Sequence, residues 1–189
     1  MNVPQDSDSR EFVHRIDLDD RLCLVNDAWL AFAEENGWRV GADAMLGTGI
    51  MSHVADAETR HIYRMLIDRV REAGHPARFH YRCDSPTLRR YMEMRMIRCR
   101  QGEIEFRSRV LRLERREPIR VLDSALPHSR DQRLQICSWC KAVYVQRTWL
   151  GLEEAVQRLG LFADAVLPQL SHGICPACSD RMTDLGVAP

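Results

Sequence analysis

The chain opens with alternating apolar and polar positions that predict a β-hairpin. Apolar residues alternate with polar ones over residues 13–18 and again over 22–25, on either side of a polar turn at 19–21. Such alternation places one row of side chains in a core and the other in water. We therefore expect two short antiparallel strands at the start of the fold.

Two stretches show helical spacing instead. Asn26 or Asp27 is a suitable N-cap for a helix that ends near Gly37. Between about residues 57 and 73, apolar side chains recur every three to four positions, and the sequence Gly74-His75-Pro76 stops the pattern. Residues 41–57 show no clear period and predict short helical turns.

Three further strands are predicted after the second helix. Gln101-Gly102 supplies a tight turn between the last two of them. The resulting order describes an α+β fold, a five-stranded antiparallel sheet with helices on one face. The three strands cover residues 78–83, 91–99 and 104–113.

Composition limits the class of protein without identifying it. The 189 residues carry 27 basic and 27 acidic side chains, so the formal net charge is zero. No apolar run approaches the roughly 18–20 residues needed to span a bilayer, and the N-terminus lacks a signal-peptide pattern. We therefore expect a cytoplasmic globular protein with no membrane partner.

Charge is unevenly distributed along the chain. Residues 78–120 hold 13 arginines against 6 acidic residues, and Lys141 is the only lysine. This stretch is either a nucleic-acid footprint or the solvated face of a sheet whose arginines pair with acids elsewhere in the fold. The zero net charge favours the second interpretation.

Two Cys-x-x-Cys pairs carry the clearest chemistry. Cys137 and Cys140 form the first pair, Cys175 and Cys178 the second, and 34 residues separate the pairs. Each pair delivers two thiolates to one edge of a tetrahedron, so we predict a structural zinc with these four ligands. His172 donates a hydrogen bond to a thiolate sulfur or to a backbone carbonyl near the site, serves as an alternative ligand, or has no metal role. The alternative is two surface thiol pairs or a redox disulfide.

Prolines and charges between the strands and the cysteines suggest a linker, which divides the chain. The predicted parts are a polar tail (1–10), a sheet domain (11–116), a linker (117–135), a four-cysteine module (136–182) and a tail (183–189).

Residues 11–116 resemble a PAS sensor domain. The resemblance rests on the element order, on Val25-Asn26-Asp27-Ala28-Trp29 and on the turn Cys83-Asp84-Ser85-Pro86. The segment Cys137-Ser-Trp-Cys140, with Ser171-His172-Gly173-Ile174-Cys175-Pro176-Ala177-Cys178, resembles a cysteine module found beside PAS and receiver domains in bacterial signalling proteins. These resemblances imply a sensory or protein-interaction role, a homodimer and a signalling partner, and they imply no catalysis.

Several side chains have two interpretations each. Met92, Met94 and Met96 form a stripe that is either solid core or an adaptable pocket for a small apolar ligand. Arg89 and Arg90 either bind an anion or a partner beside Asp84, or one of them pairs with that carboxylate. Trp139 either points outward from the first cysteine pair or packs on the sheet domain or on Trp149. No catalytic residues are predicted.

Three functions fit this sequence. The leading hypothesis is a cytoplasmic signalling protein in which a PAS-like sensor is coupled to a zinc-stabilised module. The first alternative is a redox switch in which oxidation releases the zinc. The second is a nucleic-acid-binding regulator that uses the arginine-rich strands and the metal module.

Overall fold

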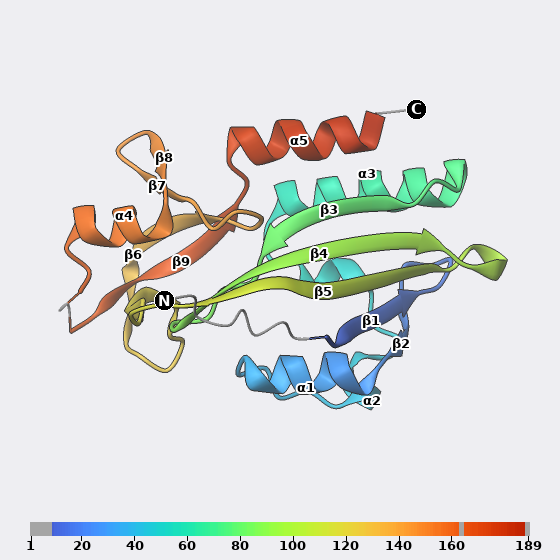
Figure 1. The fold of residues 1–189 in the computed structure, drawn as a ribbon, viewed down its shortest axis with the longest axis horizontal. Helices are drawn as coiled ribbons and strands as arrows, with labels where there is room; N and C mark the ends of the chain where they lie inside the picture. Colours follow the sequence, from blue (N-terminus) through green and yellow to red (C-terminus); the bar gives the residue numbers. More distant parts are fainter. Residues whose placement is uncertain (1–8, 163–164, 188–189) are drawn as a thin grey trace, which may run out of the picture.

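The larger of two sheets contains five strands. The computed structural model describes residues 9–162 and 165–187, and the strand order in this sheet is β2-β1-β5-β4-β3 (Figure 1). Every neighbouring pair is antiparallel. The strands are β1 (Glu11–Ile16), β2 (Leu22–Val25), β3 (Ala77–Arg82), β4 (Leu88–Arg98) and β5 (Ile104–Arg115). The predicted five-stranded antiparallel sheet is therefore confirmed.

The helices that accompany this sheet begin at polar caps. The Asn26 side chain accepts the Trp29 N–H at 2.9 Å, and Asp56 accepts the Thr59 N–H at 2.7 Å. Gly74 ends the longest helix with φ +71°, a left-handed conformation that glycine adopts without strain. The elements are α1 (Asp27–Glu35), α2 (Ala42–Met45), η1 (Ile50–His53) and α3 (Ala57–Ala73). The longest helix thus has the predicted bounds.

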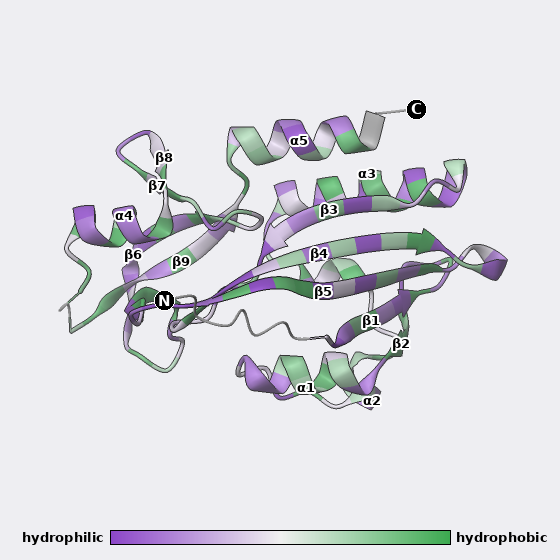
Figure 2. Cartoon of the chain, in the orientation of Figure 1, coloured by the Kyte–Doolittle hydropathy of each residue, from purple (hydrophilic) through white to green (hydrophobic). Residues whose placement is uncertain are grey.

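The two faces of the sheet differ in polarity. The face toward the helices is apolar and buried, and α3 packs on it with four side chains that are at most 4% exposed: Ile62, Leu66, Ile67 and Val70. The opposite face carries charged side chains, and Figure 2 shows purple and green bands along β4 and β5, in which charged and apolar residues alternate. There the carboxylate of Glu93, 1% exposed, accepts Arg78 Nε at 2.6 Å and Arg109 Nε at 3.1 Å. Much of the arginine-rich stretch is therefore a paired sheet face.

The turn between β4 and β5 contains two consecutive left-handed residues. Gln101 has φ +71° and Gly102 has φ +85°, within the 3-10 turn η2 (Arg100–Gly102). A Cβ on Gly102 would lie 2.7 Å from the Leu18 side chain, so glycine satisfies both the conformation and the close approach. The predicted tight turn is confirmed.

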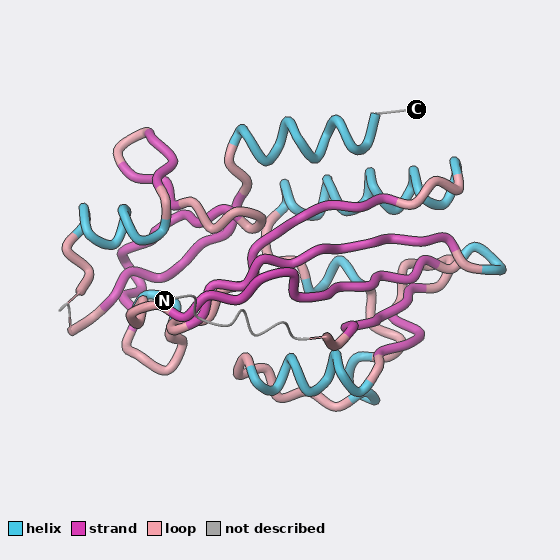
Figure 3. The backbone as a smooth tube through the Cα atoms, in the orientation of Figure 1, coloured by secondary structure: helices cyan, strands magenta, loops and turns pink. Residues whose placement is uncertain are grey.

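A second sheet follows, and the sequence did not predict most of it. Its order is β8-β7-β6-β9, and β6 and β9 run parallel, which the tube in Figure 3 shows as two long neighbouring strands. A short helix packs its buried side chains against this sheet. The elements are β6 (His128–Cys137), β7 (Val143–Val145), β8 (Thr148–Leu150), α4 (Leu152–Leu159) and β9 (Leu167–Gly173).

The predicted linker is part of this second unit. Residues 117–135 contain the 3-10 turn η3 (Arg120–Leu122) and most of β6, and Ile119 and Val121 are 5% and 2% exposed. Both side chains pack with Leu134, Leu152 and Leu167 in a separate core. The linker interpretation was wrong because β6 obtains its backbone hydrogen bonds from β9, more than 30 residues later in the chain.

The two units share one apolar core where they meet. Cys137, Trp139 and Met182 pack with α3 residues in the same buried cluster. The helix α5 (Pro176–Val187) lies beside α3. It includes much of the predicted tail 183–189, whose last two residues lie outside the described part of the chain, as do 1–8 of the predicted tail 1–10. Across the described residues, none of the helices has the length and hydrophobicity to span a bilayer.

Candidate metal centre

The first cysteine pair lies in a tight turn after β6. The Cys137 N–H donates to the Ala142 carbonyl at 2.7 Å, and the Lys141 N–H donates back to the Cys137 carbonyl at 3.1 Å. Lys141 adopts φ +62°, so the chain reverses directly after the second cysteine. This reversal brings Cys140 back toward Cys137.

The second pair lies where β9 passes into α5. The parallel pairing of β6 and β9 places Cys137 opposite Gly173, so Cys175 follows two residues after the matched position. The Cys178 N–H donates to the Cys175 carbonyl at 3.0 Å, in the first turn of α5. Parallel pairing thus brings together two motifs that lie far apart in the sequence.

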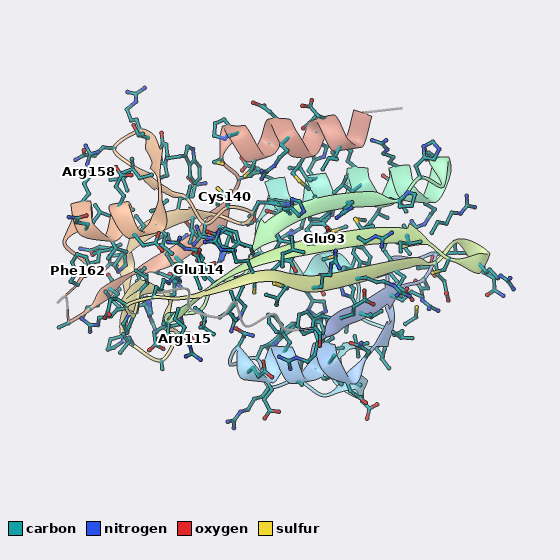
Figure 4. All side chains as sticks on the ribbon, viewed as in Figure 1. Glu93, Glu114, Arg115, Cys140, Arg158 and Phe162 are labelled. Carbon is teal, nitrogen blue, oxygen red and sulfur yellow. The ribbon has the colours of Figure 1, made fainter. Side chains whose placement is uncertain are left out.

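The four sulfur atoms form one compact cluster. All four Sγ atoms lie within 4.8 Å of one another, and Cys140 Sγ lies 3.6 Å from Cys175 Sγ. A tetrahedral zinc with bonds of about 2.3 Å would set neighbouring sulfurs about 3.8 Å apart. All four cysteines are free thiols. The cluster could therefore hold a metal ion, and Figure 4 shows Cys140 where the two units meet.

The surroundings of the cluster favour thiolate charge at some sulfurs and oppose it at others. Hydrogen bonds from Cys140 and Cys178 lower the pKa of Cys137, and burial raises the pKa of Cys175 to about 11. The Cys175 N–H approaches Cys137 Sγ at 3.4 Å, and Arg181 Nη2 approaches Cys178 Sγ at 3.2 Å. These two donors stabilise negative charge on the sulfur atoms. A bound dication would neutralise the negative charge that remains.

Three further residues lie close in sequence to the four cysteines, and the sequence analysis gave interpretations for two of them, His172 and Trp139. His172 lies on β9 with an exposed side chain and does not belong to the four-residue cluster. Lys141 Nζ donates to the Ser138 carbonyl at 2.9 Å. Trp139 is 2% exposed and lies 6.0 Å, ring to ring, from Tyr63 of α3. The expectation that Trp139 points outward was wrong, and the alternative of packing on the sheet domain is the arrangement observed.

The predicted anion site at Asp84 is an ion-pair network. The Asp84 carboxylate, 1% exposed, pairs with Arg82 and with Arg116, the latter at 3.0 Å. Arg89 pairs instead with Glu114 at 3.1 Å and with Glu153 of α4. Asp84 therefore has arginine partners, as the pairing interpretation required, but they are not the predicted arginines. The structure does not bring Arg89 or Arg90 to this carboxylate.

Arg90 has its own partners on another part of the fold. Its guanidinium donates to the Asn36 side chain at 2.9 Å and to the Cys83 carbonyl at 3.3 Å, and it lies over the Phe32 ring. The side chain is 6% exposed. Arg90 thus ties the end of α1 to the sheet.

The methionine stripe lies within the core. Met92, Met94 and Met96 are 1%, 5% and 0% exposed, and Ser108 Oγ donates to Met94 Sδ at 3.3 Å. Met94 and Met96 pack against α3 residues, and Met92 packs with Phe12. All three side chains are thus buried, and Met92 also lines a groove of about 300 Å³ beside Tyr81 and Trp139.

Glu153 connects the ion-pair network to α4 and provides a pH-dependent prediction. Burial opposes its ionisation, but hydrogen bonds from Arg89, the backbone and Arg116 outweigh burial and lower its pKa to about 2. Its contribution to stability is therefore complete above the ordinary value of 4.5 and declines as pH falls from 4.5 to 2. The side chain is 39% exposed, so screening limits this contribution to about 1 kcal/mol.

We expect Glu153→Gln to lower the free energy of unfolding at pH 7 by up to about 1 kcal/mol. The variant should also lose less stability than the parent between pH 4.5 and pH 2. Urea unfolding across this pH range measures both effects. Glu154→Gln is the control, because Glu154 is the exposed neighbour on the same helix. Equal pH profiles for parent and Glu153→Gln would contradict the prediction.

Comparison with known proteins yields likenesses of fold only. No protein-family model matches the chain, and no curated protein matches it. The similar solved structures include a sensory box sensor histidine kinase from Vibrio cholerae, with 12% identity and a TM-score of 0.40 over 55% of this chain and 83% of that one.

Two further solved structures are similar at the same level. The PAS domain of Bordetella pertussis BvgS has 19% identity and a TM-score of 0.38, covering 53% of this chain and 72% of the other. A domain of an HTR-like protein from Haloarcula marismortui has 17% identity and a TM-score of 0.37, covering 53% and 97%. The fold assignment rests on the observed strand order and helix positions: an α+β protein with a PAS-like five-stranded sheet and a C-terminal four-cysteine module.

Proposed function

We propose that this chain is a cytoplasmic signal-transduction protein in which a PAS-like sensing and dimerisation part is coupled to a zinc-stabilised interaction module. One observation carries the proposal. The Arg82 N–H, on the edge strand β3, donates to the Trp139 carbonyl at 2.7 Å. Trp139 lies between two of the four cysteines, so the hydrogen bonding of the sheet continues into the metal-binding turn.

The donor set supports zinc in a structural role. Four cysteine sulfurs suit zinc, and four thiolate ligands leave the ion no open position for water. The bound ion would supply folding free energy to the turn after β6 and to the start of α5. Cys137, Cys140, Cys175 and Cys178 would hold it. The proposal therefore assigns the module to interaction with a signalling partner and not to catalysis.

Contacts between α3 and the first cysteine turn support the coupling. Asp56, which caps α3, also accepts the Ser138 hydroxyl at 3.1 Å. Thr59 Oγ1 donates to Asp56 at 2.6 Å and lies 3.1 Å from Ser138 Oγ. The start of α3 and the metal-binding turn therefore share one hydrogen-bond network, and a shift of α3 would displace the turn.

Hydrogen exchange with and without zinc tests this coupling. Loading the metal-free full chain with one equivalent of zinc should slow exchange in residues 137–178 and also in β3 and the first turns of α3. Residues 11–35, at the far side of the sheet, should change little and serve as the internal control. Slower exchange confined to 137–178 would contradict the coupling, and native mass spectrometry of the same samples would report the proposed homodimer.

A further inference from the structure

The edge strand β3 has backbone groups without partners. The Cys83 N–H donates to the Arg90 carbonyl, so the backbone N–H and C=O groups of Tyr81 and Phe79 point toward β4. The backbone groups of the alternate residues point toward the open edge: Arg78, His80 and Arg82. Of these three, Arg82 donates to the Trp139 carbonyl. Across residues 9–162 and 165–187, the outward N–H and C=O of Arg78 and His80 form no hydrogen bond.

A cleft runs along this unpartnered part of the edge. Its volume is about 540 Å³, within the range of ligand-binding clefts. Residues of β3 form one wall, and Arg181, Asp184 and Leu185 of α5 form the other. A second groove of about 300 Å³ adjoins it, since both include His80 and Arg181. The space beside β3 is therefore open where its backbone groups are unpartnered.

The charges of this cleft define the kind of strand that fits. Arg78, Arg181 and Asp184 line the cleft together with His80. The buried Glu93 carboxylate pairs with Arg78 and with Arg109, so three guanidinium groups here accompany two carboxylates. Pairing with β3 of a second copy would place arginine and histidine opposite arginine and histidine, which is unfavourable. An extended segment with acidic side chains has the complementary charge and would satisfy the open backbone groups.

We propose that the cleft between β3 and α5 binds an extended acidic peptide segment of a partner protein as a sixth strand, beside Arg78 and His80. The Trp139 carbonyl already occupies the first hydrogen-bonding position of that strand, at Arg82. The segment would continue from there along the edge. Backbone hydrogen bonds would give affinity, and the arginines would select for acidic side chains. The inference goes beyond the proposed function and does not require the metal to carry a signal.

Selection from a displayed library of random eight-residue peptides tests the inference with the zinc-loaded full chain. We expect enriched peptides to be acidic and free of proline. His80→Pro removes the outward N–H, which a proline on a strand edge permits, and should raise the dissociation constant of these peptides at least tenfold. His80→Ala keeps the N–H and should change it less than threefold. No enrichment over background, or equal binding by both variants, would overturn the proposal.

Two further measurements keep the test decisive if His80→Pro folds poorly. Amide exchange of the parent chain should slow at Arg78 and His80 when an enriched peptide is added, with little change in α1. Peptide binding by the parent chain should weaken as salt is added, and Arg147→Gln, in the exposed turn between β7 and β8, should leave both the binding and its salt dependence unchanged. Protection elsewhere, or formation of a chain dimer in place of peptide binding, would refute the site.

Discussion

Replacing Cys175 by Ser should remove zinc from the chain and unfold the four-cysteine module. The parent, purified without chelator, should hold about one equivalent of zinc, and the variant less than about a tenth of one. The four sulfurs lie within 4.8 Å of one another, and each lost thiolate removes one corner of a tetrahedral site. Since the binding free energy of such a site is folding free energy, metal loss should expose residues 137–178.

Metal analysis and hydrogen exchange measure this outcome together. Cys23→Ser is the matched control, because Cys23 is a free, exposed thiol on β2, outside the cluster. It should keep its zinc and its exchange pattern. A Cys175→Ser chain that retains a full equivalent of zinc, or a parent that binds none while its thiols remain titratable, would contradict the metal-centre assignment.

The parts of the fold that could be predicted depend on local signals. The helix at residues 57–73 was correct at both ends because Asp56 caps it and Gly74 ends it in a left-handed conformation. The strand with Met92, Met94 and Met96 was visible from alternation alone. Each of these signals lies within a few residues of the element that it defines.

The second sheet could not be predicted from signals of this kind. In β6, only Leu134 and Ile136 precede Cys137 in an alternating pattern, and polar residues, three of them charged, fill the rest of the strand. The strand exists because it pairs in parallel with β9, a contact between residues more than 30 positions apart. Within the predicted linker, the apolar residues Ile119 and Val121 were the signal in the sequence that this segment is buried.

At the candidate site, too, local features could be predicted and contacts between distant residues could not. The four cysteines were predicted from spacing, because each pair is a local turn with known ligand geometry. The contacts around them were not predicted. Trp139 packs on Tyr63 of α3, and Asp84 pairs with Arg82 and Arg116, because tertiary packing decides which arginine reaches a buried carboxylate.

Arg116→Met should destabilise the chain by about 3 kcal/mol, because it removes a partner from a buried carboxylate. Arg116 is 9% exposed in its side chain, and it pairs with Asp84 at 3.0 Å and with Glu153 at 2.8 Å. It also donates to the Ser85 carbonyl at 2.8 Å. Methionine keeps the apolar stem but leaves the Asp84 carboxylate, 1% exposed, with Arg82 alone.

Thermal unfolding should show this loss as a midpoint lower by about 6–12 °C. Arg115→Met is the control, because Arg115 is the exposed neighbour labelled in Figure 4, and it should change stability by less than about 0.5 kcal/mol. Hydrogen exchange in α4 should also accelerate more than in α1, since Glu153 loses a partner that ties α4 to the sheet. Equal effects of the two variants would mean that the Asp84–Arg116–Glu153 network does not join the two units, and that their shared apolar core holds them together without it.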